Sequence, residues 1–335
     1  MSAGTDNGAR QDMRAAILTS PGCFEIRHVP VPRPAAGQVR IRVEGCGVCA
    51  STLPAFEGRD WFDYPLAPGG LGHEVWGVVD ACGAEVSGVE PGQRVAALSS
   101  HGFAEYDLAA GDAVIELPDT LAARAFPGEA LGCVMNIWRR ADIRAGHTVA
   151  VVGAGFLGAA LIRLAVDAGA EVIAVSRSAW SREQAAAMGA REILPLDDGG
   201  AVQRRIEQLT GGAGCERVIE ATGKPEPLNV AGALTAFGGR LVIAGFHQDG
   251  PRTVDMQMWN WRGIDVINAH ERDPAVALDG VRRAIEAVDR GKLDLARLVT
   301  HDYPLHELGE AMRAVQQRSQ GLTKAVITMG ESDHA

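Results

Sequence analysis

The chain has 335 residues, of which 47% are hydrophobic and 22% are charged, and its formal net charge is −10 at pH 7. This length is sufficient for two domains with separate cores, and the composition is that of an ordinary globular protein. The negative balance argues against a nucleic-acid partner, because phosphate binding requires clustered Lys and Arg side chains. No run of about 18 apolar residues is present, so neither a transmembrane helix nor a membrane partner is predicted.

The N-terminal segment and the cysteines favour a cytoplasmic protein. Residues 1–12 are small and polar, without the apolar segment of a signal peptide, so we expect a flexible tail there. The six cysteines are spread along the chain, which is not the pattern of a disulfide framework, and this indicates a reducing compartment. Cys46 and Cys49 have the spacing of a redox pair, but no short strand–helix–strand unit surrounds them.

Residues 14–114 predict short strands separated by turns. Residues 39–43 alternate between apolar and charged side chains, as expected of a half-buried strand. Gly and Pro punctuate this region at residues 30–37, 65–72 and 91–92. This pattern is typical of an all-β domain.

A different pattern begins near Gly146. Residues 148–152 form a continuous apolar run, which is typical of a strand buried on both faces of a parallel sheet. Further strands, alternating with helices, are expected at residues 171–175, 217–219, 240–244 and 264–267. Ser181 with Gln184 is a candidate capping box for the helix after the strand at 171–175. Repeated βα units of this kind predict an α/β domain with a doubly wound parallel sheet.

The end of the chain predicts two helices, at residues 275–290 and 305–317, and a final strand at 324–328. We expect this segment to return to the first domain. The predicted organisation is a tail at 1–12, a β-rich catalytic domain at 13–140 completed by 270–335, and a dinucleotide-binding domain at 141–269.

A dinucleotide fingerprint follows the apolar strand at 148–152. It reads Gly153-Ala154-Gly155-Phe156-Leu157-Gly158, which satisfies G-x-G-x-x-G between a strand and a helix, the context that makes this motif specific. Gly153 permits a tight turn, Gly155 lets the backbone approach a pyrophosphate, and Gly158 allows close helix–strand packing. The helix N-terminus favours the anion. We therefore predict that residues 153–158 bind NAD or NADP.

The end of the second strand of this domain predicts which cofactor is bound. An acidic residue there binds the ribose hydroxyls of NAD, whereas this chain has Ser176 followed by Arg177. NADP is favoured, because no carboxylate repels its 2′-phosphate and both Arg177 and Arg182 can pair with it. NAD remains possible if Arg177 instead stacks on the adenine. Thr222 and Gly245 are also assigned to the cofactor site.

Cys49, His73 and Glu74 offer a thiolate, an imidazole and a carboxylate in the first domain. This is the ligand mixture of catalytic zinc, which keeps one coordination position open for water or substrate. A metal of this kind combined with a hydride carrier indicates alcohol–carbonyl chemistry. We therefore predict an enzyme that acts on a small-molecule alcohol or carbonyl compound.

Taken together, these motifs resemble the zinc-dependent medium-chain dehydrogenase/reductase superfamily, in its alcohol and polyol dehydrogenase branch. The resemblance runs from about residue 14 to residue 328 and rests on residues 47–51, 72–74, 91–95, 146–149 and 153–158. It implies a GroES-like β domain built from both chain ends and an inserted Rossmann domain. It also implies an NAD(P)-dependent alcohol dehydrogenase that forms a homodimer or homotetramer.

The resemblance assigns Cys49 and His73 as the first two ligands of the catalytic zinc. Family members use either Cys or Glu as the third ligand. Counting back from Gly146 places Glu129 at that position, with Cys133 as the alternative. Glu129 matches the sorbitol-dehydrogenase-like branch. At most one zinc per chain is expected, because residues 96–110 lack the cysteines that bind a structural zinc in many relatives.

The resemblance also assigns the groups that handle the proton. Ser51 matches the hydroxyl that bonds the substrate alcohol and begins proton transfer to solvent. Glu74 can move onto the zinc in this family, or it serves as a charged partner beneath the metal. Thr52 replaces the usual Asp that orients the zinc-bound histidine, and Pro54 replaces a relay histidine of many members. We therefore expect the proton to leave through the cofactor ribose, water or Glu57.

The substrate is less strongly indicated. A Glu-type third ligand favours a polyol or sugar-like secondary alcohol and its ketone. His247 is a candidate neighbour of the nicotinamide, and Trp259 and Trp261 are candidates for the substrate cleft or a subunit interface. Two alternatives remain, an NADPH-dependent aldehyde reductase resembling the cinnamyl-alcohol-dehydrogenase branch and a zinc-free enone or quinone reductase. The retained Cys49 and His73 argue against the second.

Overall fold

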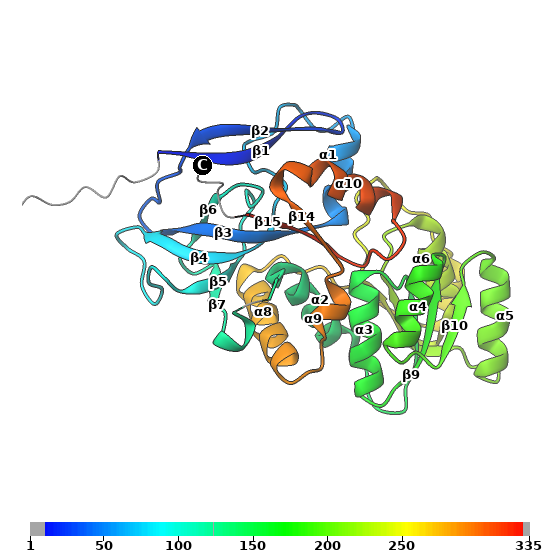
Figure 1. Cartoon of the computed structure of the whole chain (residues 1–335). Helices are drawn as coiled ribbons and strands as arrows, with labels where there is room; N and C mark the ends of the chain where they lie inside the picture. Colours follow the sequence, from blue (N-terminus) through cyan, green and yellow to red (C-terminus); the bar gives the residue numbers. More distant parts are fainter. Residues whose placement is uncertain (1–10, 123, 331–335) are drawn as a thin grey trace, which may run out of the picture. The chain divides into compact units, whose positions relative to one another are not determined.

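The computed structural model describes residues 11–122 and 124–330, which form two compact units (Figure 1). Unit 1 comprises the described residues up to Glu129, together with residues 301–319 and those from Ala325 onward. Unit 2 comprises residues 130–300 and 320–324. The predicted tail falls outside the described residues except for its end, where Asp12 is the first residue of a strand.

The described residues of unit 1 form two β-sheets. Strands β1 (Asp12–Ser20) and β2 (Cys23–Pro30) form an antiparallel pair. The second sheet has the strand order β14-β15-β3-β4-β5-β7, and β6 also pairs with β3. Its strands are β3 (Gln38–Val48), β4 (Glu74–Cys82), β5 (Arg94–Ala97), β6 (Tyr106–Ala110), β7 (Val114–Glu116), β14 (His301–Pro304) and β15 (Ala325–Thr328). The mixture of short strands and turns agrees with the Gly and Pro pattern of this region.

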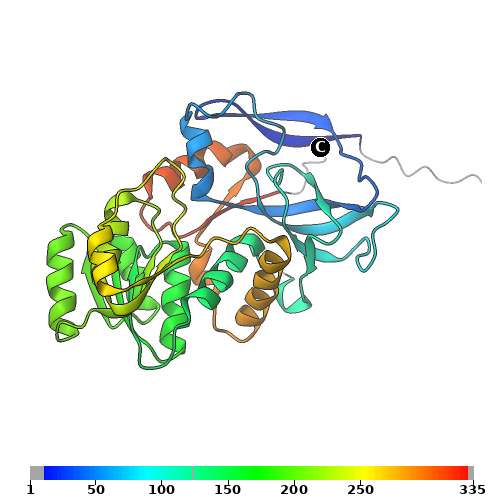
Figure 2. The same ribbon diagram turned by 180° about the vertical axis from the view of Figure 1, so that it is seen from behind.

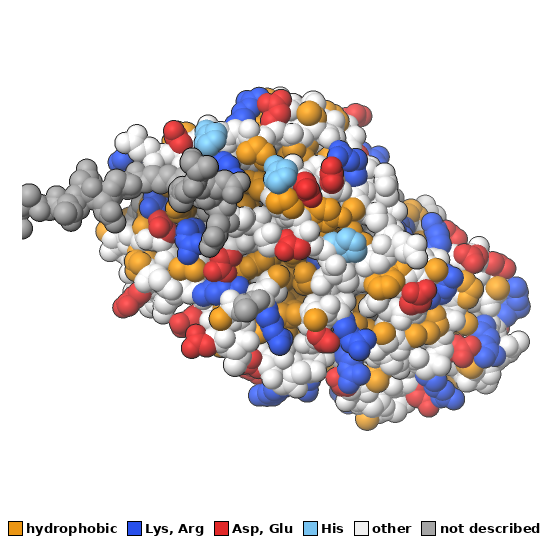
Figure 3. All heavy atoms as spheres, viewed as in Figure 1, with side chains coloured by type: hydrophobic (Ala, Val, Ile, Leu, Met, Phe, Trp, Pro, Cys, Tyr) orange, Lys and Arg blue, Asp and Glu red, His pale blue; other side chains and the backbone are white. Residues whose placement is uncertain are grey.

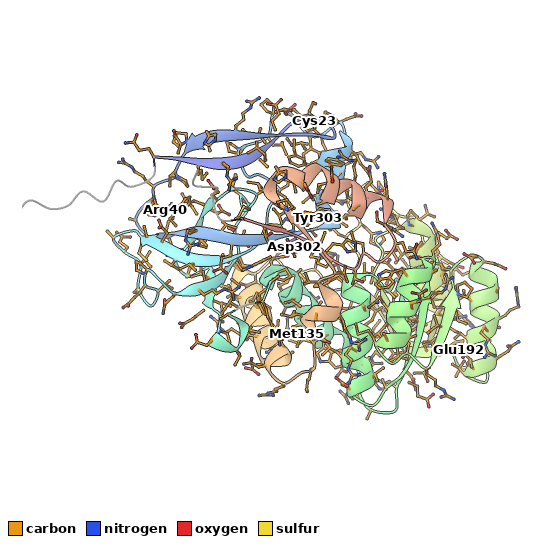
Figure 4. All side chains as sticks on the ribbon, in the orientation of Figure 1. Cys23, Arg40, Met135, Glu192, Asp302 and Tyr303 are labelled. Carbon is orange, nitrogen blue, oxygen red and sulfur yellow. The ribbon has the colours of Figure 1, made fainter. Side chains whose placement is uncertain are left out.

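The last strand of the described residues belongs to the larger sheet of unit 1. β15 pairs antiparallel with β3, so that Ala325 lies opposite Val48, and β14 pairs parallel with β15. The hydroxyl of Thr328 donates a hydrogen bond of 2.8 Å to Asp302, which is labelled on β14 in Figure 4. The chain therefore leaves unit 1 and returns to it.

The helices of unit 1 are short. The 3₁₀ turn η1 (Ala50–Thr52) and helix α1 (Leu53–Glu57) follow β3 directly. Near the C-terminus, the 3₁₀ turn η3 (Leu305–Glu307) leads into α10 (Leu308–Gln317), so this helix begins three residues later than the sequence predicts. Helix α2 (Gly128–Ala141) begins in unit 1 and continues into unit 2.

Unit 2 is built on a six-stranded parallel sheet with the order β10-β9-β8-β11-β12-β13. The strands are β8 (Thr148–Val152), β9 (Glu171–Ser176), β10 (Glu192–Pro195), β11 (Cys215–Glu220), β12 (Thr235–Ile243) and β13 (Asp265–Asn268). The helices are α3 (Phe156–Asp167), α4 (Ala179–Ala187), α5 (Gly199–Leu209), α6 (Pro225–Leu234), α7 (Met256–Arg262), α8 (Pro274–Asp289) and α9 (Leu295–Leu298). Figures 1 and 2 show helices in front of this sheet from either side.

The centre of the parallel sheet positions the cofactor site. Strand β8 is the apolar run predicted from the sequence, and Val149 to Val152 are fully buried. Its neighbours are β9 on one side and β11 on the other, so the strand order reverses at β8. Open α/β sheets bind their ligands at the carboxyl ends of the strands beside such a reversal. The fingerprint glycines occupy this end of β8.

The predicted fold class, a GroES-like β domain with an inserted doubly wound domain, is confirmed. One local prediction is wrong. Helix α4 begins at Ala179, and its N-cap is Ser178, whose side chain accepts a hydrogen bond from the backbone N–H of Ser181. Ser178 already supplies the cap one turn earlier, so Ser181 lies inside the helix and does not form the predicted capping box with Gln184.

The outer surface carries charges of both signs. Figure 3 shows Lys and Arg side chains interspersed with Asp and Glu over the face in view. Within the described residues, no helix is long and apolar enough to cross a bilayer.

Candidate metal and dinucleotide sites

The pairing of β3 with β4 brings the predicted metal ligands together in unit 1. Gly47 lies opposite Glu74 in this antiparallel register. Cys49 lies just beyond the end of β3 and His73 just before the start of β4, so the same register places them beside each other. One ligand atom from each of Cys49, His73 and Glu74 lies within 4.8 Å of the other two.

Glu74 is fully buried at the start of β4. The opposing Gly47 makes room for its carboxylate, because a Cβ at residue 47 would lie only 1.7 Å from Oε2 of Glu74. A buried carboxylate requires compensation by hydrogen bonds or by positive charge. A cation held by Cys49 and His73 would supply such charge.

His73 is oriented by the backbone. Its Nδ1 donates a hydrogen bond of 3.0 Å to the carbonyl of Leu71, which leaves the lone pair of Nε2 for a metal. Leu71 has φ 77°, in the left-handed region that is strained for a non-glycine residue. Thr52, at the position of the usual Asp, instead donates a hydrogen bond of 2.7 Å to the carbonyl of Cys49. The Leu71 carbonyl therefore orients the histidine ring in place of a carboxylate.

The electrostatic environment of His73 favours a cation. Burial lowers the pKa of His73, but the hydrogen bond to Cys49 and the negative charges of Cys49, Glu74 and Glu129 together raise it to about 10. Charges that stabilise an imidazolium would also stabilise a divalent cation in its place. The donor set of thiolate, imidazole and carboxylate matches zinc, so the residues present fit this metal.

Glu129 lies in the first turn of α2, at the end of the unit 1 segment. It is outside the three-residue group within 4.8 Å, although its charge contributes to the raised pKa of His73. The alternative ligand Cys133 follows one turn later and belongs to unit 2. The structure thus brings Cys49, His73 and Glu74 together and places Glu129 within electrostatic reach.

Cys49, His73 and Glu74 are called the metal group below. Ser51 lies in the turn η1 beside Cys49 of this group. Its hydroxyl donates to the sulfur of Cys49 over 3.1 Å. Glu57, a candidate for proton exit, contacts Arg59 at 3.1 Å and accepts a hydrogen bond of 3.2 Å from Gln316. Its carboxylate is thus held among polar groups at the surface of unit 1.

The fingerprint loop of unit 2 has the shape of an anion-binding turn. Gly153 has φ 98°, and a Cβ at Gly158 would lie 1.9 Å from the carbonyl oxygen of Gly153. A Cβ at Gly155 would meet no protein atom within 4 Å, so open space remains above this residue. Gly155 is also the N-cap of α3 and provides no side-chain cap. The first N–H groups of α3 and the open space fit a pyrophosphate.

Lys324, for which the sequence suggests no role, lies next to the fingerprint loop in unit 2. It is 5% exposed, and its Nζ lies 4.9 Å from the centre of the Phe156 ring. An ammonium group there adds positive charge where phosphates are expected. Lys324 is far from the fingerprint in sequence, and an isolated Lys before an apolar strand carries no motif that could have marked it.

The predicted cofactor-selecting residues lie at the end of β9. Ser176 is buried as the last residue of the strand, while Arg177 is exposed and lies 3.3 Å from Glu226 of α6. Arg182 turns back from α4, and its Nη1 donates to the carbonyls of Ser176 and Arg177 at 3.2 and 2.6 Å. The end of β9 therefore carries the guanidinium groups of Arg177 and Arg182, and that of Arg177 already pairs with the exposed carboxylate of Glu226.

Thr222 and Gly245 follow β11 and β12, which lie on the other side of β8 from β9. The backbone N–H of Thr222 donates to Glu220 over 2.7 Å. A Cβ at Gly245 would lie 2.1 Å from the backbone nitrogen of Gly223, so only glycine fits there. Both residues therefore lie at the carboxyl edge of the sheet.

Two protein-family models match separate parts of the chain. Residues 35–133 match the model of the alcohol dehydrogenase GroES-like domain, and residues 157–279 match the model of the zinc-binding dehydrogenase. The first match includes Cys49, His73 and Glu129, and the second begins within the fingerprint.

Curated relatives and solved structures cover almost the whole chain. The sorbitol dehydrogenase of Halalkalibacterium halodurans is 26% identical over 91% of this chain and 96% of its own. The L-galactonate-5-dehydrogenase of Escherichia coli is 26% identical over 94% and 99%. A crystal structure described as a possible zinc-binding dehydrogenase of Sinorhizobium meliloti bound to NADP has a TM-score of 0.81, with 25% identity over 95% of this chain and 100% of that one.

Proposed function

Because the chain belongs to the zinc-type medium-chain dehydrogenase/reductase family, and is thus an oxidoreductase, we propose that it interconverts a polyol or sugar-like secondary alcohol and its ketone, with NADP as the hydride carrier. The observation that carries this proposal is the group of Cys49, His73 and Glu74 within 4.8 Å, in a chain that also holds a dinucleotide fingerprint. Metal ligands and a hydride-carrier site are together the requirements of alcohol–carbonyl chemistry.

In this proposal, Cys49, His73 and Glu129 hold one zinc ion, and Glu74 is the exchangeable ligand or charged partner. Bound zinc supplies Lewis acidity, which lowers the pKa of an alcohol and polarises a carbonyl. The chain orients its ligands through the Leu71 carbonyl, which fixes the ring of His73. No structural zinc is proposed.

Ser51 is the proposed first proton acceptor in the oxidation direction. Its hydroxyl is held at 3.1 Å from the sulfur of Cys49, so it is fixed beside a metal ligand. We propose that it exchanges this bond for one to the substrate hydroxyl, accepts that proton, and passes its own proton to solvent. Pro54 cannot relay the proton, so the path beyond Ser51 runs through water, the cofactor ribose or Glu57.

The residues around the fingerprint would hold the dinucleotide. The N–H groups of residues 155–158 and the ammonium of Lys324 would bind the pyrophosphate, and Arg177 and Arg182 would bind the 2′-phosphate of NADP. The absence of a carboxylate at Ser176 supports NADP over NAD. Thr222 and Gly245 would border the other end of the cofactor.

The substrate class is inferred from the relatives. The curated relatives named above act on sorbitol and L-galactonate, which are both polyhydroxylated. Glu129 as third ligand is also the pattern of the sorbitol-dehydrogenase-like branch. We propose a small polyhydroxylated substrate on this basis.

We further propose that the protein is a cytoplasmic homodimer or homotetramer. Trp261 is 79% exposed, and Val266 of the edge strand β13 is 39% exposed. An exposed aromatic residue near an open sheet edge is a common feature of subunit interfaces. Light scattering of the purified chain would test the assembly.

The proposed function is tested by measuring kcat/KM for a panel of polyols, sugar acids, simple alcohols and aldehydes with NADP and NAD. We expect secondary polyols with NADP to give the highest values. A preference for conjugated aldehydes with NADPH would favour the aldehyde reductase alternative. A strong preference for NAD would show that Ser176 and Arg177 do not select NADP.

A further inference from the structure

We propose that Glu220, His247 and Arg252 form a polar clamp that positions the nicotinamide half of the cofactor site. This inference rests on the proposed dinucleotide binding, but not on the choice between NADP and NAD or on the metal. All three residues belong to unit 2. None of them contributes to the fingerprint or to the proposed 2′-phosphate site.

Glu220 is the centre of the clamp. It is the last residue of β11 and is fully buried. Its Oε1 accepts hydrogen bonds from the backbone N–H groups of Thr222 and Gly223, at 2.7 and 2.9 Å, and from the Thr222 hydroxyl. Its Oε2 lies 2.9 Å from Nε2 of His247, in the loop after β12. One carboxylate thus ties together the loops that follow two neighbouring strands.

Arg252 completes the clamp and determines which nitrogen of His247 carries the proton. Its Nε donates to Nδ1 of His247 over 2.9 Å. A guanidinium has only donors, so Nδ1 must be the acceptor and Nε2 must carry the proton that it donates to Glu220. Arg252 also pairs with Asp249 and donates to the carbonyl of Gly223 over 3.4 Å. The neutral imidazole therefore bridges a buried carboxylate and a guanidinium.

Close contacts connect the clamp to the fingerprint turn. A Cβ at Gly153 would lie 2.5 Å from the methyl group of Thr222, which is itself bound to Glu220. A Cβ at Gly245 would lie 2.7 Å from Oε2 of Glu220. No added methyl group would therefore fit at these contacts between the fingerprint turn, the loop after β11 and the loop after β12. Movement of either loop would change the shape of this edge of the sheet.

The order of the strands indicates which half of the cofactor meets the clamp. The pyrophosphate is expected at the carboxyl end of β8, and the residues that read the adenosine ribose lie at the end of β9. Strands β11 and β12 lie on the opposite side of β8. A dinucleotide that extends across β8 therefore places its nicotinamide half over the loops held by Glu220, His247 and Arg252.

A buried carboxylate is costly unless its hydrogen bonds are satisfied, and a satisfied network rigidifies the segments that it joins. We infer that this rigidity lowers the ordering cost of nicotinamide binding. His247 is therefore a positioning residue that acts through the two loops. If the network only stabilised the fold, its loss would weaken the binding of the nicotinamide and adenosine halves of the cofactor equally.

The test compares ligands with and without the nicotinamide. Isothermal titration calorimetry on the full chain would measure Kd for NADPH and for 2′-phospho-ADP-ribose, with NADH and ADP-ribose as the parallel pair. In His247→Ala, we expect Kd for the dinucleotides to rise on the order of tenfold, because a bond to a charged group is lost. Kd for the fragments should change by less than about twofold.

Three variants complete the design. His247→Gln should recover most of the affinity, because its amide can donate to Glu220 and accept from Arg252. Arg252→Met should repeat the selective loss, and it replaces His247→Ala if that variant does not fold. His147→Ala is the matched control, because His147 lies before β8, at the amino edge of the same sheet. It should leave all four Kd values unchanged.

Two results would overturn the clamp. One is unchanged dinucleotide affinity in both His247→Ala and Arg252→Met. The other is an equal loss for dinucleotides and fragments, which would assign the network to general stability. If the parent protein bound none of the four ligands, the proposed cofactor site itself would be contradicted, and the clamp with it.

Discussion

The metal group of unit 1 and the fingerprint loop of unit 2 are built in opposite ways. The metal group consists of side chains from separate segments, Cys49 after β3 and His73 before β4, which meet because of strand register. The fingerprint loop consists of the backbone of one continuous turn, Gly153 to Gly158. The first depends on long-range pairing for its geometry, whereas the second needs only a strand, a turn and a helix in sequence.

The two regions also differ in charge. Cys49, Glu74 and Glu129 contribute negative charge that raises the pKa of His73 to about 10, although burial alone would lower it. Around the fingerprint, helix N–H groups and the ammonium of Lys324 offer positive charge instead. One unit is therefore suited to a cation and the other to an anion. Variants that affect one site and spare the other test this division.

The largest effect is expected from Cys49→Ala. Loss of the thiolate removes a zinc ligand, and kcat/KM should fall on the order of a thousandfold, since metal stabilisation of developing charge is worth several kcal/mol. Elemental analysis should show the loss of zinc, while Kd for NADPH stays near the parent value. Cys23→Ala, at an exposed cysteine of the same unit, is the control and should leave both unchanged. If the Cys49→Ala variant retained its zinc, Cys49 would not be a zinc ligand.

The third ligand is tested by Glu129→Ala and Cys133→Ala. We expect Glu129→Ala to weaken zinc binding by about 10- to 100-fold or more. Loss of a group that hydrogen-bonds to a metal ligand already weakens metal binding by this factor, and loss of a ligand itself should weaken it at least as much. Cys133→Ala, one turn away on α2, should bind zinc as the parent does. Competition with a chromogenic chelator measures both affinities. The reverse result would assign the ligand position to Cys133.

The two fingerprint glycines should respond differently to alanine. At Gly158 the new Cβ would lie 1.9 Å from a backbone oxygen, so Gly158→Ala should lower the thermal unfolding temperature. At Gly155 the Cβ meets no protein atom, so Gly155→Ala should keep the parent unfolding temperature but raise Kd for NADPH, by roughly tenfold, through contact with the ligand. Unchanged affinity in Gly155→Ala would show that no ligand occupies this space.

A smaller effect is expected at the end of β9. Arg177→Ala should lower the preference for NADP over NAD by about tenfold, the value of one charge-assisted bond. Glu226→Gln should raise that preference by roughly two- to fivefold. Glu226 competes with the 2′-phosphate for Arg177, and the effect is small because such an exposed ion pair is weak. The ratio of kcat/KM values for NADP and NAD measures both changes. Equal ratios in the parent and both variants would exclude these side chains from cofactor selection.

Features encoded locally were predictable from the sequence. The apolar run of β8, the glycine turn and the following helix need only neighbouring residues, and the structure has them where the patterns indicate. The proximity of Cys49 and His73 was predictable because the family resemblance assigns both residues to one zinc site. Their spacing in the sequence does not indicate this by itself. Whether Glu129 completes the metal site stays a prediction.

Features that depend on long-range packing were not predictable. Lys324 lies beside Phe156 of the fingerprint loop although it is far from that loop in sequence, and no local pattern marks it. The Leu71 carbonyl orients His73 through a backbone conformation that propensity disfavours. The bridge from Glu220 through His247 to Arg252 joins two loops whose proximity follows only from the sheet order. The cap of α4 is ambiguous in the sequence for a simpler reason, since Ser178 and Ser181 are both acceptable N-caps.

The proposed function requires zinc at Cys49 and His73 for NADP-dependent alcohol oxidation. The most direct test measures zinc content and activity in the same preparations of the parent protein, before chelation, after chelation, and after zinc is restored. We expect about one zinc per chain, loss of activity with loss of the metal, and recovery on adding zinc. Full activity in a metal-free preparation would show that the reaction does not require zinc.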